Sequence, residues 1–377
     1  MLKERLSVLR GGLPDKKPAA EKNILPLRMG PGWTEIGYGC YRRTVVLPDV
    51  LPARISEAPF RGGAEDPDGY LFFDTETTGL SGGSGTLVFL IGLGRKQGNS
   101  FVITQLFLAD FPGEKDLLTV FFSLVGKNDI LVSYNGRAFD TQLLLGRAVL
   151  NRMSWDPPAQ EDLLYLVRRL WKPYLGSCSL RNVEEKLLDL HRGADVPGFE
   201  IPDLYRSWLD ERDPEILSIV FEHNLQDIYS LAKLLAHIEK TCAHPDTSPA
   251  ADRIALALWI AGRDLGKAER LLSDEFGRGN PFAGARLGFM LKKQKRAGEA
   301  ERVWIELWST YRNISAGLEL AKYFEHRLKK FQKALDLVLD ILSEVRKKPY
   351  RSRVMKEPLL HREKRLRGKL GHFQVRG

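Results

Sequence analysis

The sequence predicts an α/β domain, built on a mixed sheet flanked by helices, followed by an all-α domain of helical repeats. From residue 69, short apolar runs rich in Phe, Val and Ile follow one another and then alternate with helical patterns, which is typical of a mixed sheet. Beyond residue 250 the apolar spacing is helical throughout. We therefore expect four parts: an N-terminal extension or linker with a small β segment (1–68), the α/β domain (69–241), the repeats (250–345) and a basic tail (346–377).

The N-terminal extension combines a linker with a segment rich in aromatic and basic residues. Gly11, Gly12 and Pro14 open a Lys/Pro/Ala-rich stretch to Lys22, which indicates a flexible linker. Residues 33–46 place aromatic side chains beside arginines, namely Trp33, Tyr38, Tyr41, Arg42 and Arg43. Aromatic rings next to arginine can stack on nucleic-acid bases, but we favour a small hairpin that packs on the main domain.

The α/β domain begins with three adjacent strands. Its apolar, β-prone runs are divided by turns that contain glycine, and they cover residues 70–75, 87–93 and 100–108. A helical pattern then leads to a short apolar run and into a second helix, over residues 114–125, 130–134 and 140–151. Strands in a hairpin-like run, followed by strands that alternate with helices, predict a sheet of mixed direction.

Three more helical patterns complete this domain, over residues 162–171, 179–190 and 215–240. The last of them repeats apolar residues at the three-to-four spacing of a buried stripe, namely Leu217, Val220, Phe221, Ile228, Leu231, Leu235 and Ile238. Residues 241–252 contain two Pro together with Asp, Ser and Thr, and therefore predict a domain boundary.

The C-terminal third of the chain contains three loosely similar helical segments, at residues 254–272, 283–308 and 314–342. Their spacing of about 30 to 35 residues is that of tetratricopeptide helix pairs, which stack because one pair cannot bury its own apolar face. An ordinary helical bundle is the alternative. In either case the segment predicts an all-α domain that can bind a protein partner.

Bulk properties narrow the class of protein. Of the formal charge of +9, most comes from about a dozen Lys and Arg against two Glu after Val345, a pattern that attracts phosphates or is simply a solvated end. Cys40, Cys178 and Cys242 form no CxxC pair, so neither a disulfide scaffold nor a zinc site is predicted. No apolar run approaches the roughly 18 residues of a membrane span. We expect a cytoplasmic protein without a membrane partner.

Asp74 and Glu76 stand at the end of the first predicted strand. Because side chains alternate along a strand, both point to the same face, where one metal ion can contact both. An Asp-x-Glu pattern alone carries little information, since chance produces about one in a chain of this length. Here an apolar strand leads directly into the acids, and Thr77, Thr78 and Gly79 turn the chain away from them. This context indicates a site at the end of the strand.

Two further acidic candidates lie on helices. Asp140 follows the Asn135-Gly136 turn at the start of a predicted helix, where an Asp can equally be a simple N-cap. His223 and Asp227 are four residues apart and share one face of the last helix, although structural His–Asp pairs are common. The fold can bring all of these side chains together, and that combination favours a functional site.

Carboxylates that converge repel one another unless cations lie among them. Oxygen ligands favour Mg²⁺ or Mn²⁺ over Zn²⁺. Two such ions about 3.5 to 4 Å apart can activate a water and stabilise the leaving oxygen of a phosphodiester. The residues thus predict two ions and a phosphodiester substrate. Sugar hydrolysis needs only two carboxylates, and the glycine-rich loop at residues 81–85 lacks the Gly-Lys-Ser/Thr end of a P-loop.

At these residues the sequence resembles the DEDD-type 3′–5′ exonuclease superfamily and, within it, the bacterial YprB-type proteins with a ribonuclease H-like domain. Three motifs carry the resemblance: Phe73 to Leu80, Asn135-Gly136 with Phe139-Asp140, and His223-Asn224 with Asp227. The resemblance extends over roughly residues 70–240 and includes 177–180 and 197–205. The helical repeats that follow are also in keeping with these proteins.

The resemblance implies a ribonuclease H-like fold and a role for each candidate residue. Asp74, Glu76 and Asp227 would hold the catalytic metal ion, and Asp74 and Asp140 would contact the second. His223 would orient or deprotonate the attacking water. The sequence departs from the family pattern at one point. Other members place a Tyr four residues, or a His five residues, before the last Asp, whereas this His is four before it.

The function expected from the resemblance is removal of nucleotides from the 3′ end of single-stranded DNA or RNA. Two alternatives stay open. One is an adaptor, weak or inactive in catalysis, that binds nucleic acid or protein through its helical repeats. The other is an endonuclease of the same fold that acts on structured nucleic acid. The preference between DNA and RNA is set by how the pocket contacts the 2′-hydroxyl.

Overall fold

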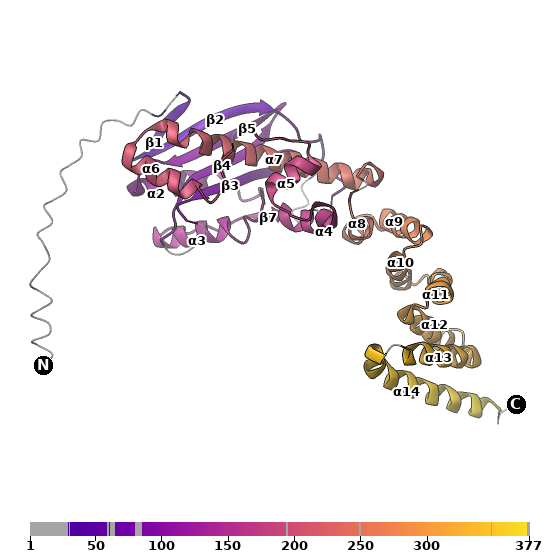
Figure 1. Ribbon diagram of the computed structural model, residues 1–377. Coiled ribbons are helices and arrows are strands. Elements are labelled where there is room, and N and C mark those ends of the chain that lie inside the picture. Colours follow the sequence, from indigo (N-terminus) through magenta and orange to yellow (C-terminus); the bar gives the residue numbers. More distant parts are fainter. Residues whose placement is uncertain are drawn as a thin grey trace, which may run out of the picture.

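A computed structural model describes residues 29, 31–58, 60, 65–79, 85–193, 195–248, 250–347 and 349–374, with side chains described only over 356–371 in the last range. The predicted linker at residues 11–22 and most of the glycine-rich loop, residues 81–84, lie outside these ranges. An α/β part contains all the strands that the structure describes, and a run of helices extends from it as an arm (Figure 1). Among the described residues, every helix is too short or too polar to cross a bilayer.

The α/β part is built on one sheet of seven strands among the described residues, in the order β1-β2-β5-β4-β3-β6-β7. The strands β1 to β5 pair with antiparallel neighbours, whereas β6 and β7 continue the sheet from β3 in parallel. The strand bounds are Trp33–Gly37, Cys40–Pro48, Tyr70–Thr77, Val88–Gln97, Ser100–Leu108, Ile130–Ser133 and Ala159–Asp162. The mixed sheet expected from the sequence is therefore confirmed, with β3 between an antiparallel and a parallel neighbour.

Alternate residues of β3 enter two different hydrophobic cores. Tyr70 and Phe72 belong to the core that also contains residues of α4 (Leu163–Leu175) and most of α7 (Ser218–Ala243). Leu71 and Phe73 belong to the core with the other sheet helices, which are α2 (Glu114–Leu124), α3 (Asp140–Leu150) and α6 (Ile201–Glu211). The helix α5 (Leu180–Leu187) packs beside α4 (Figure 1). Because both faces of β3 are covered, its polar end residues lie in a partly buried environment.

The hairpin predicted at residues 33–46 is present as β1 and β2, but β2 pairs with β5 along its whole length and therefore extends the main sheet.

Two elements of the α/β part, β7 and α6, were not predicted from the sequence. The strand β7 has no apolar run, since its residues are Ala159, Gln160, Glu161 and Asp162, and only its parallel pairing with β6 defines it. The helix α6 was also not expected. It buries Tyr205 and Trp208 against Phe107 of β5.

Glu239 of α7 fixes the segment that joins β2 to β3. Its two carboxylate oxygens accept hydrogen bonds from the backbone N–H groups of Ser56, Glu57 and Ala58 at 2.7 to 2.8 Å. Ile55 and Ala58 in the same segment are fully buried in the core beside α7. The connection between the β1–β2 hairpin and the central strand β3 is thus attached to α7.

The helical arm consists of three successive helix pairs and a final helix. The pairs are α8 (Arg253–Ile260) with α9 (Leu265–Gly277), α10 (Pro281–Lys293) with α11 (Ala297–Tyr311), and α12 (Ile314–His326) with α13 (Phe331–Arg346). Their positions match the three helical segments expected from the sequence, while the tetratricopeptide interpretation stays a prediction. Short 3₁₀ turns lie at Pro67–Gly69, Phe111–Gly113, Pro214–Leu217 and Pro245–Thr247.

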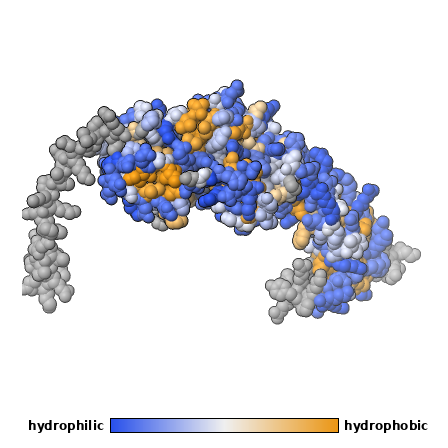
Figure 2. All heavy atoms as spheres, turned by 45° about the horizontal axis from the view of Figure 1, so that its top comes forward, coloured by the Kyte–Doolittle hydropathy of each residue, from blue (hydrophilic) through white to orange (hydrophobic). Residues whose placement is uncertain are grey.

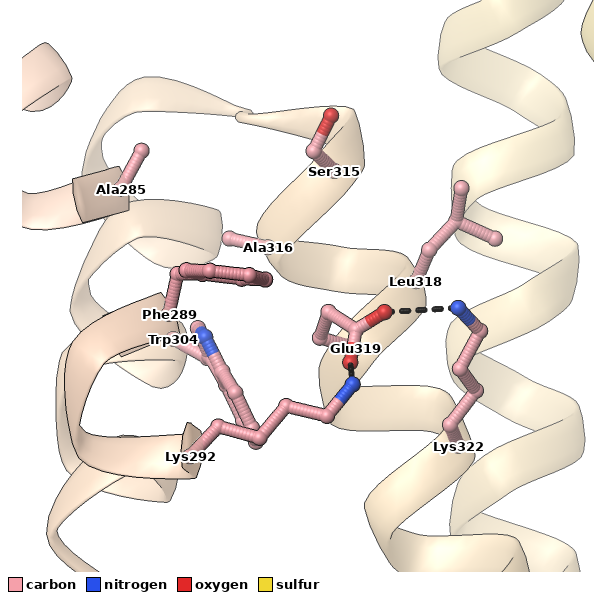
Figure 3. A pocket seen from close by; sticks show the side chains of 9 residues that line it. All are labelled: Ala285, Phe289, Lys292, Trp304, Ser315, Ala316, Leu318, Glu319 and Lys322. Carbon is pink, nitrogen blue, oxygen red and sulfur yellow. Dashed lines mark hydrogen bonds and ion pairs between the residues drawn. The ribbon is translucent and has the colours of Figure 1, made fainter. Parts of the chain in front are cut away.

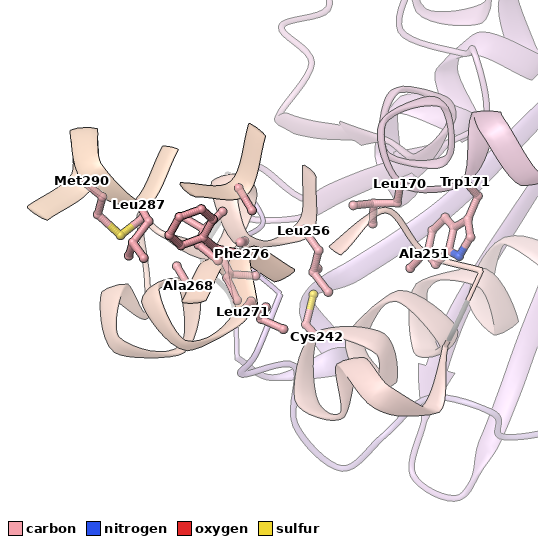
Figure 4. Close-up of a cluster of buried hydrophobic side chains, with 14 of the residues drawn as sticks. Leu170, Trp171, Cys242, Ala251, Leu256, Ala268, Leu271, Phe276, Leu287 and Met290 are labelled. Atoms are coloured by element: carbon pink, nitrogen blue, oxygen red, sulfur yellow. The ribbon is translucent and has the colours of Figure 1, made fainter. Parts of the chain in front are cut away.

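One hydrophobic core continues from the α/β part into the arm. Leu170 and Trp171 of α4 belong to the same cluster as Leu256 of α8 and Phe276 of α9, as Figure 4 shows. The backbone N–H of Asp252, the N-cap of α8, also donates to the Leu170 carbonyl at 2.7 Å. Because no polar break separates the two parts, the first helix pair is packed directly on the α/β part.

The region expected as a basic tail contains α14 (Pro349–Gln374), a helix that packs on α13. The fully buried carboxylate of Glu325 in α12 receives ion pairs from Arg362, Arg365 and Lys369 of α14. Arg367 pairs with Glu363 within the same helix. One carboxylate of α12 thus binds three cations of α14 and attaches the helix to the arm, and the helix keeps a net positive charge. Over the visible face, the arm is largely hydrophilic and apolar side chains gather in patches on the α/β part (Figure 2).

A pocket of about 360 Å³ lies between α10, α11 and α12 in the arm (Figure 3). Phe289, which is 64% exposed, lines it together with Trp304. Glu319 binds both Lys292 and Lys322, so one carboxylate is shared by the two cations that line this pocket. None of the site residues expected from the sequence lines this pocket.

Candidate metal centre

Asp74 and Glu76 lie near the end of the central strand β3 and contact residues of α7. The Asn224 side-chain amide donates to Oδ2 of Asp74 at 3.1 Å. The Nε2 atom of His223 is 4.0 Å from Oε1 of Glu76. Because side chains alternate along β3, Asp74 and Glu76 point to the same face of the strand, and both contact α7 there. Asn224, which binds Asp74, lies 150 residues further along the chain.

Glycines on β4 allow α7 to lie directly on the sheet at this point. A Cβ atom at Gly92 would be 2.3 Å from the Oδ1 atom of Asn224, and one at Gly94 would be 2.4 Å from Ile228. Asn224 is fully buried. Its amide donates to Asp74, and its Oδ1 atom accepts a hydrogen bond from the side chain of Gln105 in β5 at 3.0 Å. The close approach of helix and sheet thus fixes the residue that binds Asp74.

Asp140 is placed by the loop between β6 and α3. Asn135 adopts a left-handed conformation with φ of 66°, and a Cβ atom at Gly136 would be 3.0 Å from Oδ2 of Asp140. The carboxylate of Asp162 accepts the backbone N–H groups of Asn135 at 2.8 Å and Arg137 at 3.2 Å. The loop therefore has little freedom, and it holds Asp140 against the end of β3.

Asp140 does not act as the N-cap of α3, which was the simpler interpretation of its position. The cap residue is Phe139, and Asp140 occupies the first position within the helix. Its Oδ1 atom instead accepts a hydrogen bond from the hydroxyl of Thr75, the residue between Asp74 and Glu76. The side chain is thus tied to the acidic end of β3.

Burial and mutual repulsion raise the pKa values of the acidic residues. For Asp74 the largest cause is burial, followed by the charges of Asp227 and Asp140, and its pKa is well above the usual range. Burial and the charges of Asp74, Asp227 and Asp140 do the same for the pKa of Glu76. Burial also raises the pKa of Asp140 to about 6. The charges of Asp140 and Asp227 thus act on both Asp74 and Glu76, so the four carboxylates lie in one electrostatic environment.

This donor set suits a hard divalent cation, because partly buried carboxylates that repel one another are stabilised by a positive charge among them. Among the described residues, however, no group of three or more His, Cys, Asp or Glu side chains meets as a ready-made metal cage. Asp140 is turned toward Thr75, and Asp227 is turned toward an arginine. The donor chemistry of these residues suits a metal centre, while Asp140 and Asp227 are engaged by protein partners.

That arginine is Arg192, which the sequence did not single out. Its guanidinium donates to Oδ1 of Asp227 and also forms hydrogen bonds of 2.5 and 2.9 Å with the two oxygens of Glu184. Glu184 is fully buried in α5 and accepts a further hydrogen bond from Ser230 of α7. A permanent positive charge is thus anchored beside the last acidic residue.

His223 also has a partner that the sequence did not indicate. Its Nδ1 atom is 2.6 Å from Oδ1 of Asp195, in the same irregular segment as Arg192. We assign the Nδ1 proton to this hydrogen bond, which leaves the lone pair of Nε2 free. Nε2 is 3.6 Å from Oδ2 of Asp227 and 4.0 Å from Glu76. Asp195 therefore orients the imidazole so that its free nitrogen faces the carboxylates.

The central strand with acids at its end, the acidic loop residue and the acidic last helix define a ribonuclease H-like nuclease domain. A profile of the RNase_H superfamily matches residues 71–239. The chain is 36% identical over 289 residues to the uncharacterized protein YprB of Bacillus subtilis (strain 168), a match that covers 72% of this chain and 69% of YprB. The chain belongs to this YprB family within the RNase_H superfamily.

Two solved structures are similar to part of the chain at low sequence identity. The family B DNA polymerase of the archaeon Pyrobaculum calidifontis is 18% identical, with a TM-score of 0.37 and coverage of 52% of this chain and 28% of the polymerase. Exonuclease I of E. coli in complex with a dT13 oligonucleotide is 15% identical, with a TM-score of 0.32 and coverage of 48% and 42%. The chain thus spans less than half the length of either of these proteins.

Proposed function

We propose that the chain is a metal-dependent nuclease that removes nucleotides from the 3′ end of single-stranded DNA or RNA. The observation that carries the proposal is the position of His223, whose Nε2 faces both Glu76 and Asp227 at 3.6 to 4.0 Å. An imidazole held between acidic residues at the end of a central strand suits the activation of a water molecule beside a bound phosphodiester.

Each acidic residue has a distinct part in this proposal. Asp74, Glu76 and Asp227 would hold one divalent ion, and Asp74 and Asp140 would hold a second. Mg²⁺ or Mn²⁺ fits the oxygen ligands, and two bound ions supply a lowered pKa for the attacking water and charge for the leaving oxygen. Asn224 keeps Asp74 in place through its amide, because the hydrogen bond to Oδ2 fixes the orientation of the carboxylate.

His223 accepts a proton from the attacking water at Nε2. Asp195 accepts a hydrogen bond from the Nδ1–H group and thereby stabilises the imidazolium that results. Burial raises the pKa of Asp195, but the hydrogen bond and charge of His223 and the charge of Arg192 outweigh it, so its pKa is lowered. Asp195 therefore stays ionised while His223 gains and releases a proton.

The activity is tested with 5′-labelled single strands and the full chain in Mg²⁺ or Mn²⁺. We expect a ladder of products that shortens progressively from the 3′ end, and no products from the Asp74→Ala variant. One large fragment in place of a ladder contradicts exonuclease action and favours the endonuclease alternative. Parallel DNA and RNA strands of the same sequence then give the preference at the 2′-hydroxyl.

An adaptor role for the helical arm is the second candidate. It is favoured by the pocket between α10 and α12, where Phe289 is 64% exposed beside Trp304. Large exposed aromatic side chains in a concave site are typical of protein interaction sites. The adaptor alternative replaces the nuclease proposal if intact wild-type protein leaves all strands undegraded with either metal ion.

A further inference from the structure

The exposed face of α4 carries three cations and one aromatic ring in helical register. Tyr165, Arg168, Arg169 and Lys172 are all exposed, and their spacing of three, four and seven residues places them on one side of the helix. The opposite side is buried in the core through Leu163, Val167, Leu170 and Trp171. We call the four exposed residues the α4 stripe.

The charges of the α4 stripe are not compensated nearby. The helix contains no Asp or Glu, and among the residues that the structure describes no carboxylate pairs with Arg168, Arg169 or Lys172. Like charges three to four residues apart on a helix cost stability. In contrast, Arg362, Arg365 and Lys369 of α14 all pair with Glu325. The three cations of α4 thus have no carboxylate partner among the described residues, whereas these three cations of α14 share one.

The α4 stripe begins next to the acidic centre. Asp162 ends β7, caps α4 and also accepts the backbone N–H groups of Asn135 and Arg137 from the loop that leads to Asp140. Arg137 is itself exposed. The stripe thus continues from the loop of Asp140 along α4.

We propose that the α4 stripe binds the single-stranded nucleic acid that extends from a 3′ end held in the acidic centre, an inference that rests on the proposed function. From Tyr165 to Lys172 the stripe extends about 10 Å along the helix axis, enough for its long side chains to contact two or three successive nucleotides. Arg168, Arg169 and Lys172 contact phosphates, and the ring of Tyr165 stacks on a base. Such contacts hold a strand without reading its sequence.

The test is binding of 5′-fluorescein-labelled dT20, followed by fluorescence anisotropy as a function of salt. All proteins carry Asp74→Asn, so that binding is measured without hydrolysis. Replacing Arg168, Arg169 and Lys172 by Gln is expected to weaken binding on the order of tenfold at 100 mM salt. The slope of log affinity against log salt is expected to fall by about two, since three phosphate contacts each contribute about 0.7. Tyr165→Ala is expected to weaken binding with little change in this slope.

The matched control removes three exposed lysines from the arm, Lys329, Lys330 and Lys333, again by Gln. It changes the net charge equally and is expected to keep both the affinity and the salt slope. Thermal unfolding of each variant confirms that the fold is kept. Equal binding by the α4 and control variants, or no binding of dT20 by the parent protein at 50 mM salt, overturns the proposal. The separate hydrolysis assay with wild-type protein decides the proposed function, whatever the anisotropy shows.

Discussion

Arg192 donates a hydrogen bond to Asp227, which places a guanidinium from the segment after α5 against the last acidic residue of the candidate metal centre. The same guanidinium is held by both oxygens of the fully buried Glu184. One oxygen of Asp227 is therefore committed to Arg192, and the other faces His223 at 3.6 Å. Both oxygens of Asp227 therefore already have a neighbouring polar group.

The first prediction concerns this pair of charges. Arg192→Gln is expected to lower the free energy of unfolding by about 3 to 5 kcal/mol, because the buried Glu184 loses its partner. The double variant Glu184→Gln with Arg192→Gln removes both charges and is expected to recover a large part of this loss. Urea unfolding of the three proteins measures the effect. Equal destabilisation by the single and double variants would show that the unpaired charge of Glu184 is not the cause of the loss.

Metal ions are expected to stabilise the folded protein through the acidic centre. A divalent ion at 100 times its dissociation constant adds about 2.7 kcal/mol to the free energy of unfolding. Asp74→Asn is expected to remove most of this gain. Without metal, the same variant is expected to unfold at a higher temperature than wild type, since it removes one of the carboxylates that repel each other. Thermal unfolding with Mn²⁺ and with a chelator tests both statements.

His223 and Asp195 are expected to affect turnover rather than binding of the strand. His223→Ala removes the base for the attacking water and is expected to lower kcat by about 10² to 10⁴. Asp195→Asn leaves the imidazole in place but weakens its orientation, so the loss is expected to be smaller. Steady-state kinetics on a short labelled strand measure kcat and KM for both. A change confined to KM contradicts the assigned roles.

Gly92 is expected to be essential for the site although it carries no side chain. In Gly92→Ala the new Cβ would be 2.3 Å from Oδ1 of Asn224, so the amide that binds Asp74 must move. We expect a loss of about 1 to 3 kcal/mol in the free energy of unfolding, together with loss of hydrolysis. Gly146→Ala in α3 is the control. A Cβ there meets nothing within 4 Å, and the helix is expected to gain up to about 1 kcal/mol.

The packing of α14 on the arm is expected to weaken in acid. Burial raises the pKa of Glu325, but hydrogen bonds from Arg365 and Lys369 outweigh it and lower the pKa to about 2 from an ordinary value of 4.5. Because the folded state has the lower pKa, the stabilisation is complete above pH 4.5 and is lost as the pH falls toward 2. The difference in unfolding temperature between wild type and Glu325→Gln is expected to shrink over this range. A constant difference would rule out the carboxylate as its source.

The long elements of the fold could be predicted because their apolar residues follow a regular period. The strand β5 begins and ends at the predicted residues, 100 and 108, and α7 carries the predicted buried stripe. In β7 the residues are mostly polar and the strand exists because β6 offers a parallel edge, which no local pattern reveals. The helix α6 was not predicted, although its buried residues Ile201, Tyr205 and Trp208 follow a helical spacing.

The part of the candidate site that lies on regular elements could be predicted from the sequence, whereas the part on an irregular segment could not. Asp74, Glu76, Asp140, His223 and Asp227 stand at element ends or in helical register, so their positions could be inferred from the pattern around them. Arg192 and Asp195 lie in the irregular stretch between α5 and α6. Their contacts with residues 223 and 227 depend on how that stretch folds across α7. Sequence spacing contains no signal for such a contact.

The position of Asp227 on the final helix of the α/β part has a consequence for the protein during its synthesis. A nascent chain that ends before Ser218 already contains every strand that the structure describes, together with Asp74, Glu76 and Asp140. It lacks Asn224, His223 and Asp227, and it also lacks the helix that covers one side of β3. Under the proposed function, an unfinished chain on the ribosome therefore cannot cut nucleic acid, including the messenger that encodes it.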